Sequence, residues 1–438
     1  MSTLDTPDRN RIKIKPQLLC PHCWHEFAAD QVLFISESPE LLGDSKLGDT
    51  ASLRFLPFRF DVSGAAIDSH KYPCHKIACP NCHLQIPRSL LHLSNSFISI
   101  VGAPASGKSY FLASMIWQLR KTMARGFCMS FADAEPEMNR RIRSDVSKQF
   151  DNDDPDKLVY IDKTQVEGDI YNVTNIGGQV ISLAQPFIYT MSPMPGHPLQ
   201  NKPERISRSV CLYDNAGESF LPGADKVTQP VTRHLATSDA ILFLFDPTQN
   251  LRFKRACKQS VNDPQMNPEL GVDVRKSDVP QEIILTEMIT RVRDHLRLSP
   301  NEKHKSPLII VLTKFDAWQQ LTNFSHYHNP WEPVQNMAIS AYSVKRVEEY
   351  SQILRKLLLD LIPDLVSTAE TFSENVTYIA VSATGRPPEF GPPDNEGKRQ
   401  LMFRSGEINP VWTEVPFFHA HAQARKYCIP VLLSKSKK

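Results

Sequence analysis

Short apolar runs recur along the middle of the chain, and each ends in turn residues. They are rich in β-branched residues and almost continuously apolar, so each predicts a strand that is covered on both faces. Six runs have this pattern: "SFISIVG" (96–102), "PFIYTM" (186–191), "SVCLYD" (209–214), "AILFLFD" (240–246), "LIIVLTK" (308–314) and "TYIAVSA" (377–383).

Apolar residues at helical spacing lie between these runs. They predict helices over 109–123, 281–298 and 342–361. Strands that alternate with helices and are buried on both faces are typical of a doubly wound α/β domain, with a mainly parallel sheet between two layers of crossover helices.

The rest of the chain divides around this pattern. Residues 1–95 are expected to form a separate small module, and 96–438 the α/β domain. Two long polar stretches, about 125–185 and 247–279, are expected as insertions in that domain. From Gly385 the sequence "GRPPEFGPPDNEGKRQ" predicts a loop, and 415–426 predicts a last helix that covers the sheet.

Composition indicates the class of protein but not its binding partner. The 438 residues are 41% hydrophobic and 22% charged, with a formal net charge of +2. These values are ordinary for a globular protein and give no global electrostatic reason for binding nucleic acid or an anionic membrane. No apolar run is long enough to span a membrane and the N-terminus has no signal-peptide pattern, so we expect a cytoplasmic protein.

The first motif with chemistry is "GAPASGKS", between a predicted strand and a predicted helix. This context is what a phosphate-binding loop requires. Gly102 and Gly107 let main-chain N–H groups approach phosphate oxygens. Lys108 is expected to reach the β- and γ-phosphates and Ser109 to offer its hydroxyl to Mg²⁺. The remaining expected nucleotide contacts of the loop are Ala105, Ser106 and Tyr110.

A second motif, "DNAGE", follows the run at 209–214. Asp214 is expected to hold Mg²⁺ through a water, and the Gly217 N–H to bond the γ-phosphate only in the triphosphate state. Glu218 is the candidate that orients the attacking water, and it could also repel the γ-phosphate oxygens.

The third and fourth motifs are expected to recognise the base of the bound nucleotide. "TKFD" places Thr313, Lys314 and Asp316 at a strand end. The Asp316 carboxylate can accept from the N1–H and N2 amino groups of guanine, which adenine lacks, so it discriminates strongly. Lys314 can cover the base with its aliphatic stem. In "SAT", which comprises Ser382, Ala383 and Thr384, the Ala383 N–H is expected to meet the guanine O6.

In this order, the four motifs resemble those of the Ras-like GTPases of the TRAFAC clade, over roughly residues 96–384. The threonine in "TKFD" is similar to that of Rho-type proteins. The resemblance implies a P-loop NTPase fold and a GTPase, with GTP or GDP and Mg²⁺ as cofactors, that hydrolyses GTP slowly without a partner.

The chain departs from that family in length. The stretch between Gly102 and Asp214 is far longer than in a minimal Ras-like domain. Thr174 and Thr190 are both candidates for the switch threonine that completes Mg²⁺ coordination. The candidates for an internal arginine finger are Arg205, Arg208 and Arg233.

Five of the nine cysteines lie within the first 82 residues, which indicates a metal site. "CPHC" and "CPNC" have the spacing of two zinc knuckles, so Cys20, Cys23, Cys79 and Cys82 are predicted to bind a structural Zn²⁺. Alternative ligands are Cys74, His22, His25, His75 and His83. The long segment between the two knuckles is expected to be an insertion or a small added sheet.

A zinc ribbon directly before "SNSFISIVGAPASGKS" resembles bacterial TRAFAC proteins of the double-GTPase type, which are linked with predicted conflict and defence systems. The final "INPVWTEVPFFHAHAQA" is also similar. The resemblance implies a GTP-hydrolysing switch that regulates partner proteins. Two other interpretations remain open: a GTP-dependent factor that binds nucleic acid through the ribbon, and a pseudo-GTPase scaffold that binds nucleotide without turnover.

Overall fold

The computed structural model describes residues 14–161, 171–215, 220, 231–257, 263–266, 279–322, 324, 328–393, 399–424 and 428–432. The chain forms two compact units. The first comprises Met1–Asn95 and Val173–Leu183, and the second Ser96–Asn172 and Ala184–Lys438. Part of the insertion expected at about 125–185 therefore packs with the first unit rather than with the second.

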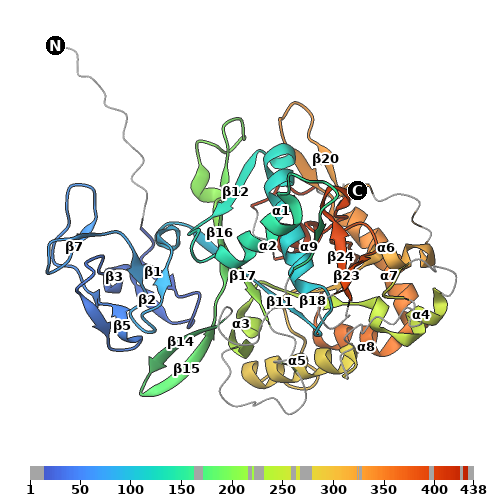
Figure 1. The fold of residues 1–438 in the computed structure, drawn as a ribbon, viewed down its shortest axis with the longest axis horizontal. Helices are drawn as coiled ribbons and strands as arrows, with labels where there is room; N and C mark the ends of the chain where they lie inside the picture. The colour runs from blue at the N-terminus through green and yellow to red at the C-terminus, as the bar shows by residue number, and fades with distance from the viewer. Residues whose placement is uncertain are drawn as a thin grey trace, which may run out of the picture. The chain divides into compact units, whose positions relative to one another are not determined.

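The second unit is a mixed α/β structure around one seven-stranded sheet (Figure 1). Its strand order is β12 (Met129–Asp133), β16 (Phe187–Pro193), β17 (Arg208–Asp214), β11 (Ser94–Gly102), β18 (Ala240–Phe245), β19 (Leu308–Leu312) and β22 (Val376–Ala380). The pairs β11–β18, β18–β19 and β19–β22 are parallel, whereas β12–β16 and β16–β17 are antiparallel.

Alternate residues of the central strands face two separate apolar cores. Ile100, Leu242 and Val311 belong to one core, and Val101, Phe243 and Ile310 to the other. Both faces are thus covered, which explains why these strands are almost continuously apolar.

Helices cover both faces, and α1 and α5 lie on opposite sides of the sheet (Figure 1). The first core contains residues of α1 (Lys108–Phe127), α2 (Arg140–Phe150) and α9 (Val415–Gln423). The second contains residues of α3 (Val231–Thr237), α4 (Leu251–Ala256), α5 (Gln281–Leu296), α6 (Phe315–Trp318) and α8 (Pro363–Phe372). Helix α7 (Val344–Leu361) contributes to both.

Two stretches differ from the expectations. The expected insertion begins with β12, which joins the main sheet as an edge strand. The expected loop after Gly385 contains β23 (Glu389–Pro393), which pairs with β24 (Arg399–Arg404), and β24 pairs with β13 (Leu158–Val159). Both strands of the tail are short and interrupted by proline, glycine or charged residues, so their hydrophobic pattern is weak.

The first unit is built from short strands. Its four-stranded sheet has the order β10 (Gln85–Ile86), β9 (Ile77–Ala78), β3 (Leu33–Ile35) and β6 (Arg54–Phe55). The remaining strands form two-stranded pairs: β1 (Gln17–Leu19) with β2 (Glu26–Ala28), β4 (Leu42–Asp44) with β5 (Gly48–Ser52), β7 (Ala66–Ile67) with β8 (Pro73–Cys74), and β14 (Tyr171–Ile176) with β15 (Gln179–Ala184). Within this unit the Thr174 hydroxyl donates to the Cys82 carbonyl at 2.7 Å.

Candidate functional site

The motifs of the second unit meet at one edge of its sheet. After β11 the chain adds β12, β16 and β17 on one side of that strand and then β18, β19 and β22 on the other. The carboxyl end of β11 is therefore a topological switch point, where open α/β sheets bind ligands. Gly102, Asp214, Thr313 and Ser382 lie at or just beyond the carboxyl ends of their strands.

The predicted phosphate loop connects β11 to the long helix α1. Ala105 and Gly107 have positive φ angles of 58° and 86°, which turn the main chain sharply before the helix. The Lys108 ammonium donates to the carbonyls of Gly102 and Ala103, at 2.8 and 2.9 Å. A Cβ on Gly102 would lie 2.6 Å from the Leu244 carbonyl, so this position requires glycine.

Three other predicted loop residues are positioned by this turn. Ser106 is fully buried, and its carbonyl accepts from the Thr313 hydroxyl at 3.1 Å. Ser109 is the second residue of α1. Tyr110 packs against Phe403, and its hydroxyl accepts from the Ile161 N–H at 2.9 Å. Tyr110 therefore connects α1 to the segments that contain Ile161 and Phe403.

Asp214, the predicted magnesium residue, already has a cationic partner. Its Oδ2 lies 2.8 Å from Nη2 of Arg141 in α2, and its side chain is 5% exposed. The next residue, Asn215, is fixed to β11 because its N–H and its side-chain amide donate to the Ile100 carbonyl at 3.2 and 3.1 Å. Gly217 and Glu218 lie outside the described residues.

A buried histidine holds Asn215 from the other side. Nε2 of His234 lies 2.8 Å from Asn215 Oδ1, and its Nδ1 lies 2.7 Å from the Ser99 hydroxyl. Burial lowers the pKa of His234 to about 3, so the ring is neutral at physiological pH. This serine–histidine–asparagine group is inside the core, and we interpret it as a structural anchor of the strand end.

The predicted base residues are brought together from β19 and β22. The Ser382 hydroxyl donates to the Asp316 carboxylate and accepts from the Gly385 N–H at 2.7 Å. The Ala383 carbonyl accepts from Ser114 of α1 at 2.7 Å, and the Thr384 hydroxyl donates to the Arg386 carbonyl at 2.9 Å. Burial raises the pKa of Asp316 to about 6.

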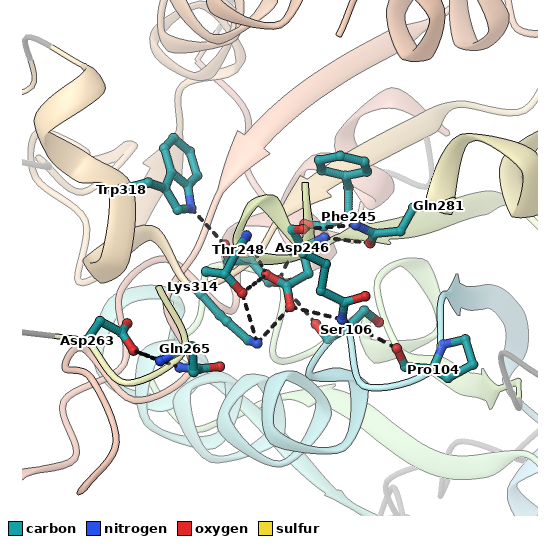
Figure 2. Close-up of polar contacts among 12 residues, drawn as sticks. Pro104, Ser106, Phe245, Asp246, Thr248, Asp263, Gln265, Gln281, Lys314 and Trp318 are labelled. Carbon is teal, nitrogen blue, oxygen red and sulfur yellow. Dashed lines mark hydrogen bonds and ion pairs between the residues drawn. The ribbon is translucent and has the colours of Figure 1, made fainter. Parts of the chain in front are cut away.

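Lys314 lies in a polar network that sequence reasoning did not include. Its ammonium is 2.7 Å from Asp246 Oδ2 and 3.3 Å from the Thr248 hydroxyl (Figure 2). The fully buried Asp246 also accepts from Gln249, whose amide contacts the Pro104 carbonyl at 3.4 Å. The network therefore links the base lysine to the phosphate loop. The sequence feature that could have predicted this network is Asp246, a carboxylate at the end of an apolar strand.

Two further groups near Lys314 were missed. Gln281, at the start of α5, exchanges hydrogen bonds with the Asp246 main chain at 2.8 and 2.9 Å. Asp263 is buried, and that burial raises its pKa. Figure 2 shows Asp263 beside Gln265, whose N–H donates to it at 2.8 Å.

The structure places the other candidates away from this edge. Arg205 and Arg208 lie at the amino end of β17, opposite the end that carries Asp214. Arg233 is exposed on α3. Thr190 lies inside β16, where its hydroxyl donates to the Ala132 carbonyl at 3.4 Å. The strand geometry thus argues against Arg205 and Arg208 as arginine fingers.

The four predicted zinc ligands form a compact cluster in the first unit. The sulfur atoms of Cys20, Cys23, Cys79 and Cys82 all lie within 4.8 Å of one another. The two knuckles have matching turns, in which Trp24 and His83 have φ angles of 58° and 60°. In each turn an N–H donates to sulfur, from His22 to Cys20 at 3.4 Å and from Asn81 to Cys79 at 3.3 Å.

Three of the five alternative ligands have other side-chain contacts. Cys74 is buried 3.6 Å from Asp68 Oδ2, His22 contacts the Gln85 carbonyl at 2.9 Å, and His83 contacts Asp44 at 2.8 Å. Four closely spaced thiols are the donor set that a closed tetrahedral zinc site needs. Hydrogen bonds among the thiols lower the pKa of Cys23, whereas burial raises the pKa of Cys20 well above its ordinary value.

Comparisons with known proteins give distant matches. No family model matches the chain. Over 325 residues it is 24% identical to "Putative ESX-1 scaffolding and assembly protein SaeC" of Mycolicibacterium smegmatis, which covers 71% of this chain and 72% of that protein. Among the described helices, none is long and apolar enough to cross a membrane.

The solved structures that match at low similarity include the "Crystal structure of Era in complex with MgGDPNP and nucleotides 1506-1542 of 16S ribosomal RNA". Its TM-score is 0.21 and its sequence identity 12%, over 70% of this chain and 62% of that chain. This chain thus spans less than two thirds of that chain.

Proposed function

We propose that the second unit binds GTP at the carboxyl edge of its sheet and hydrolyses it, as a switch that regulates partner proteins. The hydrogen bond from Thr313 to Ser106 is the observation that carries the proposal, because it joins the base motif to the phosphate loop. A nucleotide that spans this junction would place its phosphates on the N-terminus of α1 and its base against Asp316.

Each group has a separate part in this proposal. The main chain of the loop and Lys108 would bind the phosphates, and the ionised Asp316 would accept the two N–H groups of guanine. Ser109 and Asp214 have the oxygen ligands that Mg²⁺ prefers, and the ion would neutralise phosphate charge. Asp214 would first have to separate from Arg141, since the two side chains are ion-paired.

In the first unit, the four cysteines would hold Zn²⁺ with no open coordination position, which makes the metal structural rather than catalytic. The curated Mycolicibacterium relative is described as a scaffolding and assembly protein, which supports proteins rather than nucleic acid as partners. The same description favours the second candidate, a scaffold that binds nucleotide without turnover.

An Asp316→Asn variant tests the base assignment. Its amide should no longer accept both guanine donors, so we expect GTP affinity to fall roughly a thousandfold. Xanthine carries an oxygen where guanine has its amino group, so XTP should become the preferred ligand. Affinities for GTP, XTP and ATP are measured by calorimetry.

Asp364→Asn is the matched control, since Asp364 is exposed in the first turn of α8. It should bind GTP as the wild type does. Equal binding of GTP and ATP by the wild type would contradict the guanine assignment. Phosphate release from bound GTP then separates the two candidates, because a pseudo-GTPase scaffold would release none.

A further inference from the structure

The ion pair between Arg141 and Asp214 joins the long insertion to the predicted magnesium residue. Arg141 lies in the first turn of α2, and Asp214 ends β17. Their side chains are only 19% and 5% exposed, and the atoms Nη2 and Oδ2 are 2.8 Å apart. The Coulomb attraction between charges this shielded from solvent is stronger than in a surface salt bridge, and either charge left without a partner there would be costly.

The neighbouring residues hold Arg141 in place. Its guanidinium lies over the Phe187 ring, 5.7 Å from the centroid. The residue before α2, Asn139, exchanges hydrogen bonds with the main chain of Ile188 at 2.9 Å in both directions. At the other end of α2, Phe150 stacks on Trp117 of α1 at 4.3 Å. Arg141 is therefore fixed by packing at the place where it meets the carboxylate.

We propose that Arg141 competes with Mg²⁺ for Asp214, so that binding of Mg²⁺ with nucleotide releases the start of α2. The inference rests on the proposed function. A guanidinium and a divalent cation at one shielded carboxylate repel each other, so tight occupation by one disfavours the other. The two arrangements are linked states, and the insertion becomes an element that responds to the nucleotide.

Substitution of Arg141 by glutamine tests this competition. The variant should bind GTP about fivefold or more tightly than the wild type in the presence of Mg²⁺. In EDTA its affinity for GTP should equal that of the wild type, because no metal then competes with Arg141 for Asp214. Arg140→Gln is the matched control: Arg140 is the preceding residue, is exposed, and pairs with the exposed Glu137. It should change neither affinity.

Amide hydrogen exchange of the full-length wild type provides a measurement that needs no substitution. Addition of Mg²⁺ and GTP should accelerate exchange in the first turn of α2, and Mg²⁺ alone should do so less. Unchanged or slower exchange there would overturn the inference.

The outcomes separate the two proposals. If GTP binds but Arg141→Gln and the wild type depend equally on Mg²⁺, the competition is wrong and the nucleotide site stands. If neither protein binds GTP in Mg²⁺ or in EDTA, the proposed function is wrong, and this inference with it.

Discussion

The cysteine cluster and the proposed nucleotide edge, at the carboxyl ends of β11, β17, β19 and β22, are built in opposite ways. Each cysteine knuckle is local, because its two ligands are separated by only two residues and its turn closes on itself. The nucleotide edge collects residues from the ends of β11, β17, β19 and β22, and no two motifs adjoin in sequence. The cluster therefore requires one pairing of two hairpin-like turns, whereas the edge requires the whole sheet.

This difference has consequences for motion as well as for assembly. Four buried thiols around the predicted Zn²⁺ would leave no coordination position open for exchange, so we expect the cluster to be rigid. At the nucleotide edge, Asp214 and Lys314 pair with Arg141 and Asp246, and a bound nucleotide would compete with such pairs. We therefore expect the cysteine cluster to stabilise the fold and the charged side chains of the proposed nucleotide edge to exchange partners.

The largest expected effect is loss of the metal. Cys79→Ser should abolish Zn²⁺ binding and expose the first unit to proteolysis, because structural zinc contributes about 10 kcal/mol or more of apparent binding free energy. Zinc content is measured by atomic absorption, and cleavage by limited proteolysis. Cys74→Ser, at a buried cysteine outside the cluster, should retain zinc. Zinc at wild-type content in Cys79→Ser would show that the four thiols are not one site.

A smaller effect is expected from the phosphate loop. Gly102→Ala should lower the free energy of unfolding by roughly 1–3 kcal/mol, because the new methyl group overlaps the main chain of β18. Gly126→Ala is the control: at that helical position a Cβ would make only an ordinary contact with Trp331 Nε1 at 4.0 Å, so the variant should gain about 0.5–1 kcal/mol in its free energy of unfolding. Urea unfolding measures both. Equal stability of Gly102→Ala and the wild type would mean that the loop is not tightly seated.

The smallest effect concerns pH and the base. Burial raises the pKa of Asp316 to about 6, so its carboxylate takes up a proton at higher pH than an exposed aspartate does. Only the ionised form accepts both guanine donors. GTP affinity should therefore be constant above about pH 7 and fall roughly tenfold per unit below about pH 6.

Affinities measured from about pH 8 to about pH 5 test this step. XTP binding by Asp316→Asn should lack it, since an amide does not titrate in this range. A flat GTP profile in the wild type would contradict the role of Asp316. The cysteine cluster should add no further step to the dependence of GTP affinity on pH.

The central strands could be predicted because burial on both faces gives them continuous apolar runs. The predicted ends of the strands are less accurate. The sequence predicts a strand over 308–314, but β19 ends at Leu312, and Lys314 adopts a φ of 54° that no strand allows. The edge strand β12 was missed, since "MSFAD" alternates too briefly to stand out from a loop.

The site was predictable only as far as its motifs are local. The cysteine spacing and "GAPASGKS" carry their own geometry. Arg141 could not be distinguished from Arg140 or Arg143, because its partner Asp214 is brought near only by the sheet. Gln281 was hidden for the same reason, since its contacts to Asp246 depend on how α5 meets β18.

The hairpin at 173–183 makes the two units inseparable by a single cut. Its Thr174 and Asn175 bond to main-chain atoms of Cys82 and Lys46, so it belongs to the first unit although the second supplies the chain on both sides. A fragment that starts at residue 96 would keep this hairpin but lose its partners, and one that ends at 95 would lack it. Exchange of the cysteine module between related proteins would thus require two segments to be transferred together.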